Sequence, residues 1–207
     1  MTSDTPLRAD AARNRARIVA AARSVFAESG IDVTLDEVAR AAGVGVGTVY
    51  RRFSGKDELL EAVFDTVIAE LNSLMDAAAA EEDAWTGLVG LLHAVAERQS
   101  ADQGLVQVCT RAELGLAERV GAHFVPAVDS LVARAQAQGT VRPDVTGPDL
   151  GPILLMVAAT FDIAPPNLWR RYLTLALDGL RAGSTTPLPG PVPSHEDIDA
   201  AMRKRLS

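Results

Sequence analysis

Apolar residues recur at helical spacing along most of this chain, and no convincing stretch alternates apolar and polar residues with a period of two. That periodicity restricts the fold, because a chain without strands buries its apolar stripes only by packing helix on helix. Ile18, Ala22 and Phe26 lie on one face of a first helix that is expected to end near Gly30. Aromatic residues make up only 4% of the chain, while alanine, the best helix former, is abundant. The sequence predicts an all-α fold.

About nine helices are expected, with ends marked by caps, glycines and prolines. Thr34 and Glu37 have capping-box spacing and mark one helix start, and Pro126 is expected to kink a later helix because it removes a backbone donor. A turn-rich connector is expected at residues 139–149, and a proline-rich, flexible tail after Gly183. The expected helices cover residues up to 30, then 34–41, 46–53, 56 to about 75, 85–99, 105–113, 116–138, 149–161 and 167–182, with a marginal one at 194–207.

The charge of the chain is divided unevenly. Its net charge is −7, but residues 8–56 hold nine basic and five acidic residues, a net charge of +4, which leaves −11 for the remainder. A basic end on an otherwise acidic protein suits an encounter with nucleic acid through one face. A basic segment that is merely solvated would look the same.

Several classes of function find no support in the sequence. The longest apolar run, residues 153–161, is about half of the roughly 18 residues that cross a bilayer, and arginines interrupt any signal peptide near the start. The single cysteine excludes an intrachain disulfide, and the three histidines are too scattered to suggest a metal site. No phosphate-binding loop, HExxH, nucleophile elbow or CxxC pattern points to an enzyme. We expect a cytoplasmic protein that is not an enzyme and holds no metal or cofactor.

Two short expected helices, residues 34–41 and 46–53, are separated by a tight turn at Gly43, a residue that tolerates positive φ. If Val49 and Phe53 face inward at i, i+4, the second helix presents hydroxyl, methyl and guanidinium groups outward. This arrangement is typical of a helix-turn-helix whose second helix enters the major groove of DNA. The side chains expected to face base edges are Val46, Thr48, Arg51 and Arg52.

Lys56 opens the next helix, directly after Ser54, and Ser54 and Asp57 have capping-box spacing. A cation at a helix N-terminus opposes the helix dipole, whereas a bound phosphate would reverse the effect by pairing with Lys56 and with free backbone N–H groups. The hydroxyl of Tyr50 can also reach a phosphate. The alternative is that Lys56 is tolerated there because it is exposed.

The run Gly43-Val-Gly-Val-Gly-Thr-Val-Tyr-Arg-Arg-Phe-Ser-Gly-Lys-Asp-Glu-Leu-Leu60, with Thr34-Leu-Asp-Glu-Val-Ala upstream, resembles the DNA-binding signature of tetracycline-repressor (TetR) family regulators over about residues 10–62. A weaker resemblance is Gly139-Thr-Val-Arg-Pro-Asp-Val, before the last two helices. The resemblance implies a helix-turn-helix domain at residues 1–55 and a helical effector-binding and dimerisation domain at 56–183, and the proline-rich tail occupies 184–207. It also implies DNA phosphate contacts from Thr34, Thr48, Tyr50 and Lys56. This chain departs from the family pattern at Gly45 and Gly47, which leave few side chains at the start of the recognition helix. Specificity is therefore expected to depend on Arg51, Arg52 and DNA shape.

The last two expected helices are apolar on more than one face, so each must be buried on two sides. A central pair inside a monomer is awkward, because these helices end the folded chain. They resemble the last two helices of TetR-family regulators, which form a four-helix bundle with those of a second copy. The resemblance therefore implies a homodimer. The expected interface residues are Ile153, Leu154, Val157, Leu168, Trp169, Tyr172, Leu173, Ala176, Leu177 and Leu180.

The middle helices hold candidates for a small-molecule pocket, since pockets between bundle helices are apolar with a few polar anchors. Each candidate also has a purely structural interpretation. His93 would lie on the flank of a helix, Trp85 and Phe124 would belong to the core, and Cys109 would be a small buried side chain rather than a redox sensor. The pocket candidates are Trp85, His93, Gln107, Cys109, Arg111, His123, Phe124, Met156 and Phe161.

These expectations combine into a repressor that binds a palindromic DNA operator as a homodimer and is released by an unknown small apolar effector. The effector would bind in the core and shift the helix that Lys56 opens. An activator, or a regulator controlled by a protein partner, is the alternative within DNA binding. The alternatives outside it are an enzyme built on the helical bundle and a structural dimer whose N-terminal helices never touch DNA.

Overall fold

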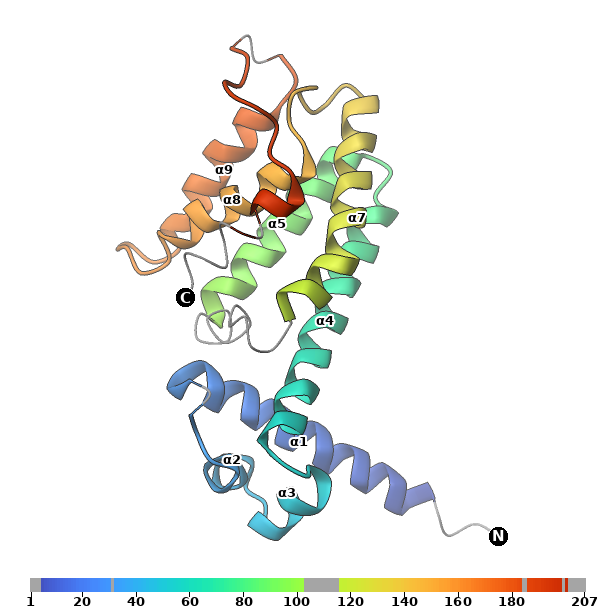
Figure 1. The fold of residues 1–207 in the computed structure, drawn as a ribbon, viewed down its shortest axis with the longest axis vertical. Helices are drawn as coiled ribbons and strands as arrows, with labels where there is room; N and C mark the ends of the chain where they lie inside the picture. Colours follow the sequence, from blue (N-terminus) through green and yellow to red (C-terminus); the bar gives the residue numbers. More distant parts are fainter. Residues whose placement is uncertain (1–4, 31, 103–115, 184–185, 199, 201–207) are drawn as a thin grey trace. The chain divides into compact units, whose positions relative to one another are not determined.

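The computed structural model describes residues 5–30, 32–102, 116–183, 186–198 and 200. The described chain is helical, apart from an isolated antiparallel bridge between Val141 and Arg181, which confirms the all-α prediction (Figure 1). The expected helix at residues 105–113 lies outside the described residues. The helices are α1 (Thr5–Ser29), α2 (Leu35–Ala42), α3 (Val46–Arg52), α4 (Lys56–Ala80), α5 (Ala84–Ala101), α7 (Leu116–Ala137), α8 (Gly147–Ala158) and α9 (Leu168–Leu180).

The chain forms two compact units, and α4 contributes to both. The N-terminal unit contains the residues up to Ile68, and the C-terminal unit contains most of the residues from Ala69 on. The sequence places the domain boundary earlier, between residues 55 and 56. The division falls inside α4 because its first turns bury Leu59 and Val63 outside the core cluster of the C-terminal unit.

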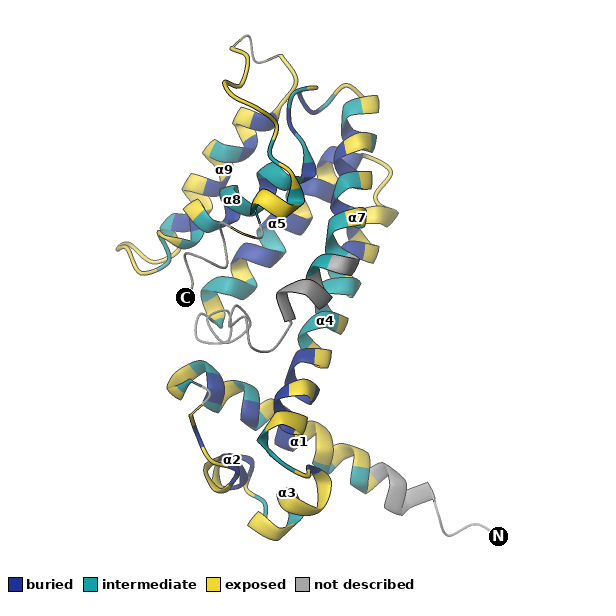
Figure 2. Cartoon of the chain, in the orientation of Figure 1, coloured by how far each residue is buried: buried dark blue, intermediate teal, exposed yellow. Residues whose placement is uncertain are grey.

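The core of the N-terminal unit is built from the inner faces of its helices (Figure 2). Ile18 and Phe26 of α1, Val38 of α2, and Val49 and Phe53 around α3 are at most 1% exposed. Their spacing within each helix is the i, i+4 and i, i+8 pattern that keeps apolar side chains on one face. These contacts fix how α2 and α3 are presented to solvent.

The core of the C-terminal unit collects one stripe from each of α5, α7, α8 and α9. Gly87 marks a close approach of the chain, since a Cβ there would lie 2.4 Å from the carbonyl oxygen of Ala78. Any side chain at this position would therefore push α5 away from the end of α4. The largest fully buried side chains of this core are Leu88, Leu92, Val145, Trp169 and Leu173.

The ends of α8 and α9 differ from the sequence-based prediction. Helix α8 begins at Gly147 rather than near residue 149, because Thr146 and Asp149 form a capping box. The Thr146 N–H and hydroxyl donate to Asp149 Oδ2 at 2.7 and 3.0 Å. Helix α8 ends at Ala158 and α9 at Leu180, each earlier than expected. Helix α7 continues through Pro126.

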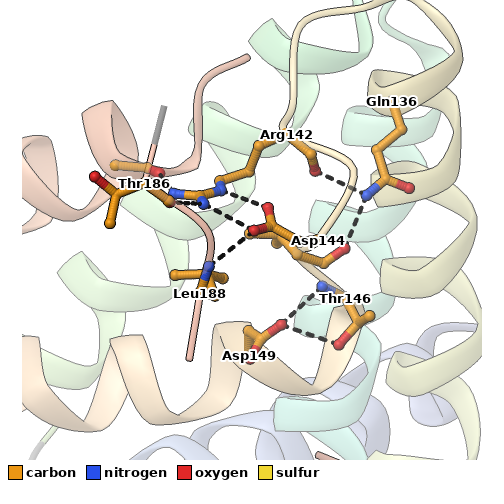
Figure 3. Close-up of polar contacts among 9 residues, drawn as sticks. Gln136, Arg142, Asp144, Thr146, Asp149, Thr186 and Leu188 are labelled. Atoms are coloured by element: carbon orange, nitrogen blue, oxygen red, sulfur yellow. Dashed lines mark hydrogen bonds and ion pairs between the residues drawn. The ribbon is translucent and has the colours of Figure 1, made fainter. Parts of the chain in front are cut away.

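The connector before α8 is held by a buried arginine (Figure 3). Arg142, 6% exposed, donates from Nε and Nη2 to the two carboxylate oxygens of Asp144 at 2.5 and 2.8 Å. Its Nη2 also donates to the carbonyl oxygen of Thr186 at 2.5 Å, and the Leu188 N–H donates to Asp144 at 3.0 Å. Gln136 Nε2 donates to two connector carbonyl oxygens at 3.0 and 2.8 Å. The connector and the start of the tail therefore form one hydrogen-bonded cluster.

The tail folds back onto the C-terminal unit over residues 186–198, although the sequence analysis expects a flexible segment there. His195 Nε2 lies 2.9 Å from Asp129 Oδ2 on α7. The Ser194 hydroxyl donates to Asp197 Oδ2 at 2.6 Å and accepts the Asp197 N–H at 3.1 Å, so Ser194 caps a short helical turn as expected. The composition of the tail suggests flexibility because it does not reveal the partners of the tail on α7 and in the connector, which lie far away in sequence.

Candidate nucleic-acid interface

The turn between α2 and α3 is tight and depends on Gly43. This residue adopts φ 62° and ψ 37°, the left-handed conformation that side-chain-bearing residues disfavour. Its N–H and that of Val44 donate to the last carbonyl groups of α2, Arg40 at 3.1 Å and Ala39 at 3.0 Å. The chain can then start α3 immediately, with Gly45 as its N-cap. The helix-turn-helix predicted from the sequence has this geometry.

Helix α3 turns its inner face to the core and its polar face to solvent. Val49 and Phe53 are both fully buried. Val46 is 40% exposed and Tyr50 55% exposed, and the exposed side chains also include Arg51 and Arg52, while Thr48 is half-buried. Arg51 Nη2 donates to Thr48 Oγ1 at 3.2 Å, which orients the guanidinium along the helix. The solvent face of α3 is therefore positively charged, with no acidic residue between Val46 and Arg52.

Thr34 is occupied by the cap of α2. Its hydroxyl donates to Glu37 Oε2 at 2.8 Å and accepts the Glu37 N–H at 3.3 Å, and its own N–H donates to the same carboxylate at 2.7 Å. These bonds from the Thr34 backbone and hydroxyl hold the pKa of Glu37 below its usual value, with a smaller lowering by Arg40 against a rise from burial. A phosphate at Thr34 would have to displace this carboxylate, so Thr34 is the least suitable of the four expected phosphate contacts.

Lys56 is the first residue of α4 and is half-buried. The expected pairing of Ser54 with Asp57 is wrong: the Ser54 N–H donates instead to Glu58 Oε2 at 2.6 Å. Glu58 follows Asp57 in the sequence, and its carboxylate accepts the Ser54 N–H in place of that of Asp57. Residue spacing alone does not distinguish these two pairings. Hydrogen bonds from Ser54 hold the pKa of Glu58 below its usual value.

Helix α1 contacts both ends of α3 through two arginines that the sequence does not identify as contacts. Arg17 Nη2 donates to the carbonyl oxygen of Gly43 at 3.3 Å, and the Arg15 guanidinium lies 5.5 Å from the centre of the Phe53 ring. The basic character of this segment is visible in the sequence. Its partners are not, because they depend on how α1 crosses α2 and α3.

In the C-terminal unit, three aromatic rings meet between α5, α9 and the segment after α8. His93 and Phe161 each lie 6.2 Å, between ring centres, from Trp169, and Phe161 is edge-on at 84°. Trp169 is only 2% exposed. Arg170 places its guanidinium 4.5 Å above the Trp169 ring and pairs with Glu97 at 2.6 Å. Trp169, an expected residue of the dimer interface, therefore lies between His93 and Phe161, two of the expected pocket residues.

The protonation of His93 follows from this environment. Partial burial lowers the pKa of His93 most, and the nearby charge of Arg170 lowers it further. Glu97 acts in the opposite direction and raises it. The imidazole therefore holds its proton less readily than a solvated histidine.

The other expected pocket residues do not gather at this cluster. Trp85 precedes His93 by about 12 Å along α5, and the Arg181 guanidinium lies 4.4 Å from its ring. Phe124 packs against the core, and Met156 is 64% exposed on α8. Gln107, Cys109 and Arg111 lie outside the described residues, and the side chain of His123 is not described.

The expected dimer interface divides into two groups. Six of its residues are at most 7% exposed and belong to the core of their own chain: Leu154, Val157, Trp169, Leu173, Leu177 and Leu180. They pack against α5 and α7, which the sequence pattern does not reveal. On the neighbouring face of α9, Tyr172 is 44% and Leu175 57% exposed, flanked by half-buried Leu168 and Ala176. Ile153, on α8, is half-buried and packs at the edge of the core.

Comparisons with known proteins agree with this geometry. A family model described as bacterial regulatory proteins, tetR family, matches residues 18–63, and one described as transcriptional regulator SbtR-like, C-terminal domain, matches residues 83–182. The chain is 33% identical to the uncharacterized HTH-type transcriptional regulator Rv2250c of Mycobacterium tuberculosis over 139 residues, which cover 64% of this chain and 72% of that protein. Its similarity to the uncharacterized regulator TtgW of Pseudomonas putida is higher, 52% over 56 residues, but covers 27% of this chain and only 42% of the relative.

A solved structure with similar architecture is a TetR transcription regulatory protein from Mycobacterium vanbaalenii. It is 35% identical, with a TM-score of 0.65, and the match covers 86% of this chain and all of the other. In the part of this chain that the structure describes, no helix is long and apolar enough to span a bilayer.

Proposed function

Because this chain belongs to the TetR family of bacterial regulatory proteins, which are DNA-binding transcription regulators and not enzymes, we propose that it represses transcription by binding a palindromic operator as a homodimer. We further propose that a small apolar effector releases it. The observation that carries the proposal is α3, which presents exposed arginines, a tyrosine and a valine on a face free of acidic residues. Such a regulator works where the bacterial chromosome lies, in the cytoplasm.

Base recognition is assigned to Val46, Thr48, Arg51 and Arg52. An arginine reads guanine through two hydrogen bonds, and the methyl groups of Val46 and Thr48 suit thymine. The bond from Arg51 to Thr48 limits the conformations of that guanidinium before it meets DNA. Few side chains project from the start of α3 because of Gly45 and Gly47, so the shape of the operator contributes to specificity.

Phosphate contacts are assigned to Thr48, Tyr50 and Lys56, with Thr34 as a weaker candidate because Glu37 occupies it. Tyr50 is 55% exposed and directly precedes Arg51 and Arg52 on α3. Lys56 stands at the N-terminus of α4, where free backbone N–H groups and the helix dipole favour an anion. Such contacts set the register of the protein on DNA and contribute most of its salt-dependent affinity.

Dimerisation is assigned to the outer faces of α8 and α9. Met156, Tyr172 and Leu175 are large apolar side chains that this chain leaves between 44% and 64% exposed. A second copy would cover them in a four-helix bundle with two-fold symmetry. The two recognition helices of such a dimer require half-sites separated by about 34–36 Å, one DNA turn, or a multiple of it.

Effector binding is assigned to the C-terminal unit near the cluster of His93, Phe161 and Trp169. This cluster is apolar with a few polar groups at its edge, the character of small-molecule sites. Helix α4 offers a route for the signal, because it begins at Lys56 in the N-terminal unit and ends at Ala80 in the C-terminal unit. A ligand that favours one arrangement of α4 shifts the equilibrium away from the arrangement that binds DNA.

The decisive experiment selects bound sequences from a random DNA pool with the purified protein. We expect a palindromic sequence to be enriched, and the double substitution R51A/R52A to lose the preference for it over random duplex. The matched control R51K/R52K keeps the charge and the affinity for random duplex, but loses selectivity because lysine cannot form the two-pronged contact. Failure to enrich any sequence, or binding that ignores salt, would overturn the proposal.

Release is tested separately with long-chain alcohols and fatty acids. A compound that raises the melting temperature of the protein is expected to lower its affinity for the selected operator, since both effects follow from binding to one conformation. Compounds that stabilise the protein without changing operator affinity would contradict the effector part of the proposal while leaving DNA binding intact.

A further inference from the structure

Helix α1 begins well before the segment that the TetR family model matches. It starts at Thr5, whereas the match starts at residue 18. At about 1.5 Å per residue, the thirteen residues before the match extend the helix by about 20 Å. Figure 1 shows this end of α1 projecting beyond α3. We name residues 5–17 the α1 arm; nothing in the DNA contacts assigned above uses it.

The α1 arm is strongly basic. It holds four arginines and one aspartate, a net charge of +3 in thirteen residues. The described side chains among them, Arg13, Arg15 and Arg17, are exposed. A net positive charge of this density on a protein of net charge −7 is not explained by the solubility of the chain.

The arm is placed beside the helix-turn-helix by contacts within the N-terminal unit. Arg17 donates to the carbonyl oxygen of Gly43, in the turn from which α3 starts, and Arg15 lies over Phe53 at the other end of α3. Arg13 lies one turn upstream of Arg17 on the same face, about 6 Å farther along the helix. Arg17 and Arg13 therefore place two positive charges on one face of α1, and Arg13 lies farther toward the N-terminal end of the arm.

We propose that the α1 arm binds the phosphate backbone of DNA that borders the groove occupied by α3, with Arg13 as its principal contact. The inference rests on the proposed DNA binding and adds a second basic surface to it. The major groove is about 12 Å wide, so an arm of about 20 Å passes from a helix seated in the groove to the strand that bounds it. The partner follows from charge: a dense line of phosphates complements a ridge of guanidinium groups.

Asp10 sets the strength of this contact in the free protein. Its carboxylate pairs with Arg13 three residues away, and the two side chains are 63% and 70% exposed. A phosphate that binds Arg13 must compete with Asp10 and is repelled by it. Substituting Asp10 is therefore expected to strengthen DNA binding, an effect opposite in sign to that of substituting Arg13.

The test measures the affinity of the full chain for a random-sequence DNA duplex by fluorescence anisotropy at several salt concentrations. Loss of one phosphate contact in R13Q is expected to lower the slope of log affinity against log salt by about 0.9 for each protomer on the duplex. Between 50 and 200 mM salt, that change makes the loss of affinity about 3.5-fold smaller. R13K keeps the charge and is expected to retain the wild-type slope, while D10N is expected to bind more tightly than wild type.

Two outcomes would overturn the inference: an R13Q slope equal to that of wild type, or a D10N variant that binds more weakly. A melting curve for each variant shows that the chain remains folded. The positive control is K56A, whose slope must fall if the proposed DNA contacts are correct. If K56A responds and R13Q does not, only the α1 arm is rejected; if the wild-type chain binds no duplex, the proposed function is rejected with it.

Discussion

Lys56 and Glu58 lie in the first turn of α4 and have opposite relations to a bound phosphate. Glu58 satisfies the Ser54 N–H and so stabilises the start of the helix. Lys56 has no such role in capping, and its charge opposes the helix dipole. Under the proposed function Lys56 binds a phosphate while Glu58 caps the helix, so the two residues should respond differently to substitution.

Replacing Lys56 by alanine is expected to weaken binding to all DNA sequences alike and to lower the salt slope by about one. The fold should remain intact, because the lysine contributes no cap. Fluorescence anisotropy with operator and random duplexes measures both effects. K56R is the matched control and is expected to keep the slope. A K56A variant that loses affinity only for the operator would remove Lys56 from the phosphate contacts.

His93 predicts a pH dependence of stability. Burial, then the charge of Arg170, lowers the pKa of His93 in the folded chain, so the unfolded chain takes up this proton at a higher pH than the folded chain. The free energy of unfolding therefore falls as the pH drops through the ordinary histidine range, about 6.5, toward the folded pKa. H93Q removes this term, so its melting temperature should fall less than that of wild type between about pH 7.5 and about pH 5.5. Equal falls in the two proteins would show that His93 is solvated.

At the scale of elements, α9 shows how far the sequence alone leads. Its composition correctly predicts a helix with two apolar faces. Periodicity does not tell which face packs inside the chain, because Leu173 and Leu175 are chemically identical and differ only in their neighbours. The same limit applies to α1, whose arginines are plain in the sequence while their partners at Gly43 and Phe53 are not. Local signals such as the turn at Gly43 and the cap at Thr34 are predictable because all their atoms lie within a few residues.

Substitutions on the two faces of α9 are expected to have different results. L175E places a charge on the outer face, where it should convert the dimer to a folded monomer that binds operator weakly. L173A leaves a cavity in the core and should lower the free energy of unfolding by about 2–5 kcal/mol. Light scattering after size exclusion separates monomer from dimer, and chemical denaturation measures stability. A dimeric L175E would place the interface elsewhere.

At the scale of the whole molecule, the chain divides by charge as well as by fold. The basic residues concentrate at the end that carries α3 and the α1 arm, and the remainder is acidic. An acidic C-terminal unit is expected to repel the DNA backbone, which favours contact at the basic end of the chain. The tail is held by contacts between distant parts of the sequence. Its partners, Asp129, Arg142 and Asp144, are more than forty residues away.

Ending the chain after Gly183 is expected to lower the melting temperature, because the buried Arg142 loses Thr186 and Asp144 loses the Leu188 N–H. Ending it after Ile198 is the matched control and should have little effect. The pKa of Asp144 is held well below its usual value, first by Arg142 and then by the Leu188 N–H, so its stabilisation is present above about pH 4 and is lost as the pH falls further. Truncation after Gly183 should therefore also reduce the acid sensitivity of the melting temperature. An unchanged melting temperature would show that the tail does not contribute.

The separation of α9 into an inner and an outer face has a genetic consequence. A copy that keeps the outer face but carries a disabled α3 would still dimerise with normal copies. Each mixed dimer would contain one α3 that cannot bind DNA, so a single mutant allele would inactivate most of the dimers. A copy altered at Leu175 would associate with nothing and leave the normal allele to act alone. Dominance of a mutant over wild type in a merodiploid strain would thus report which surface of the chain had been damaged.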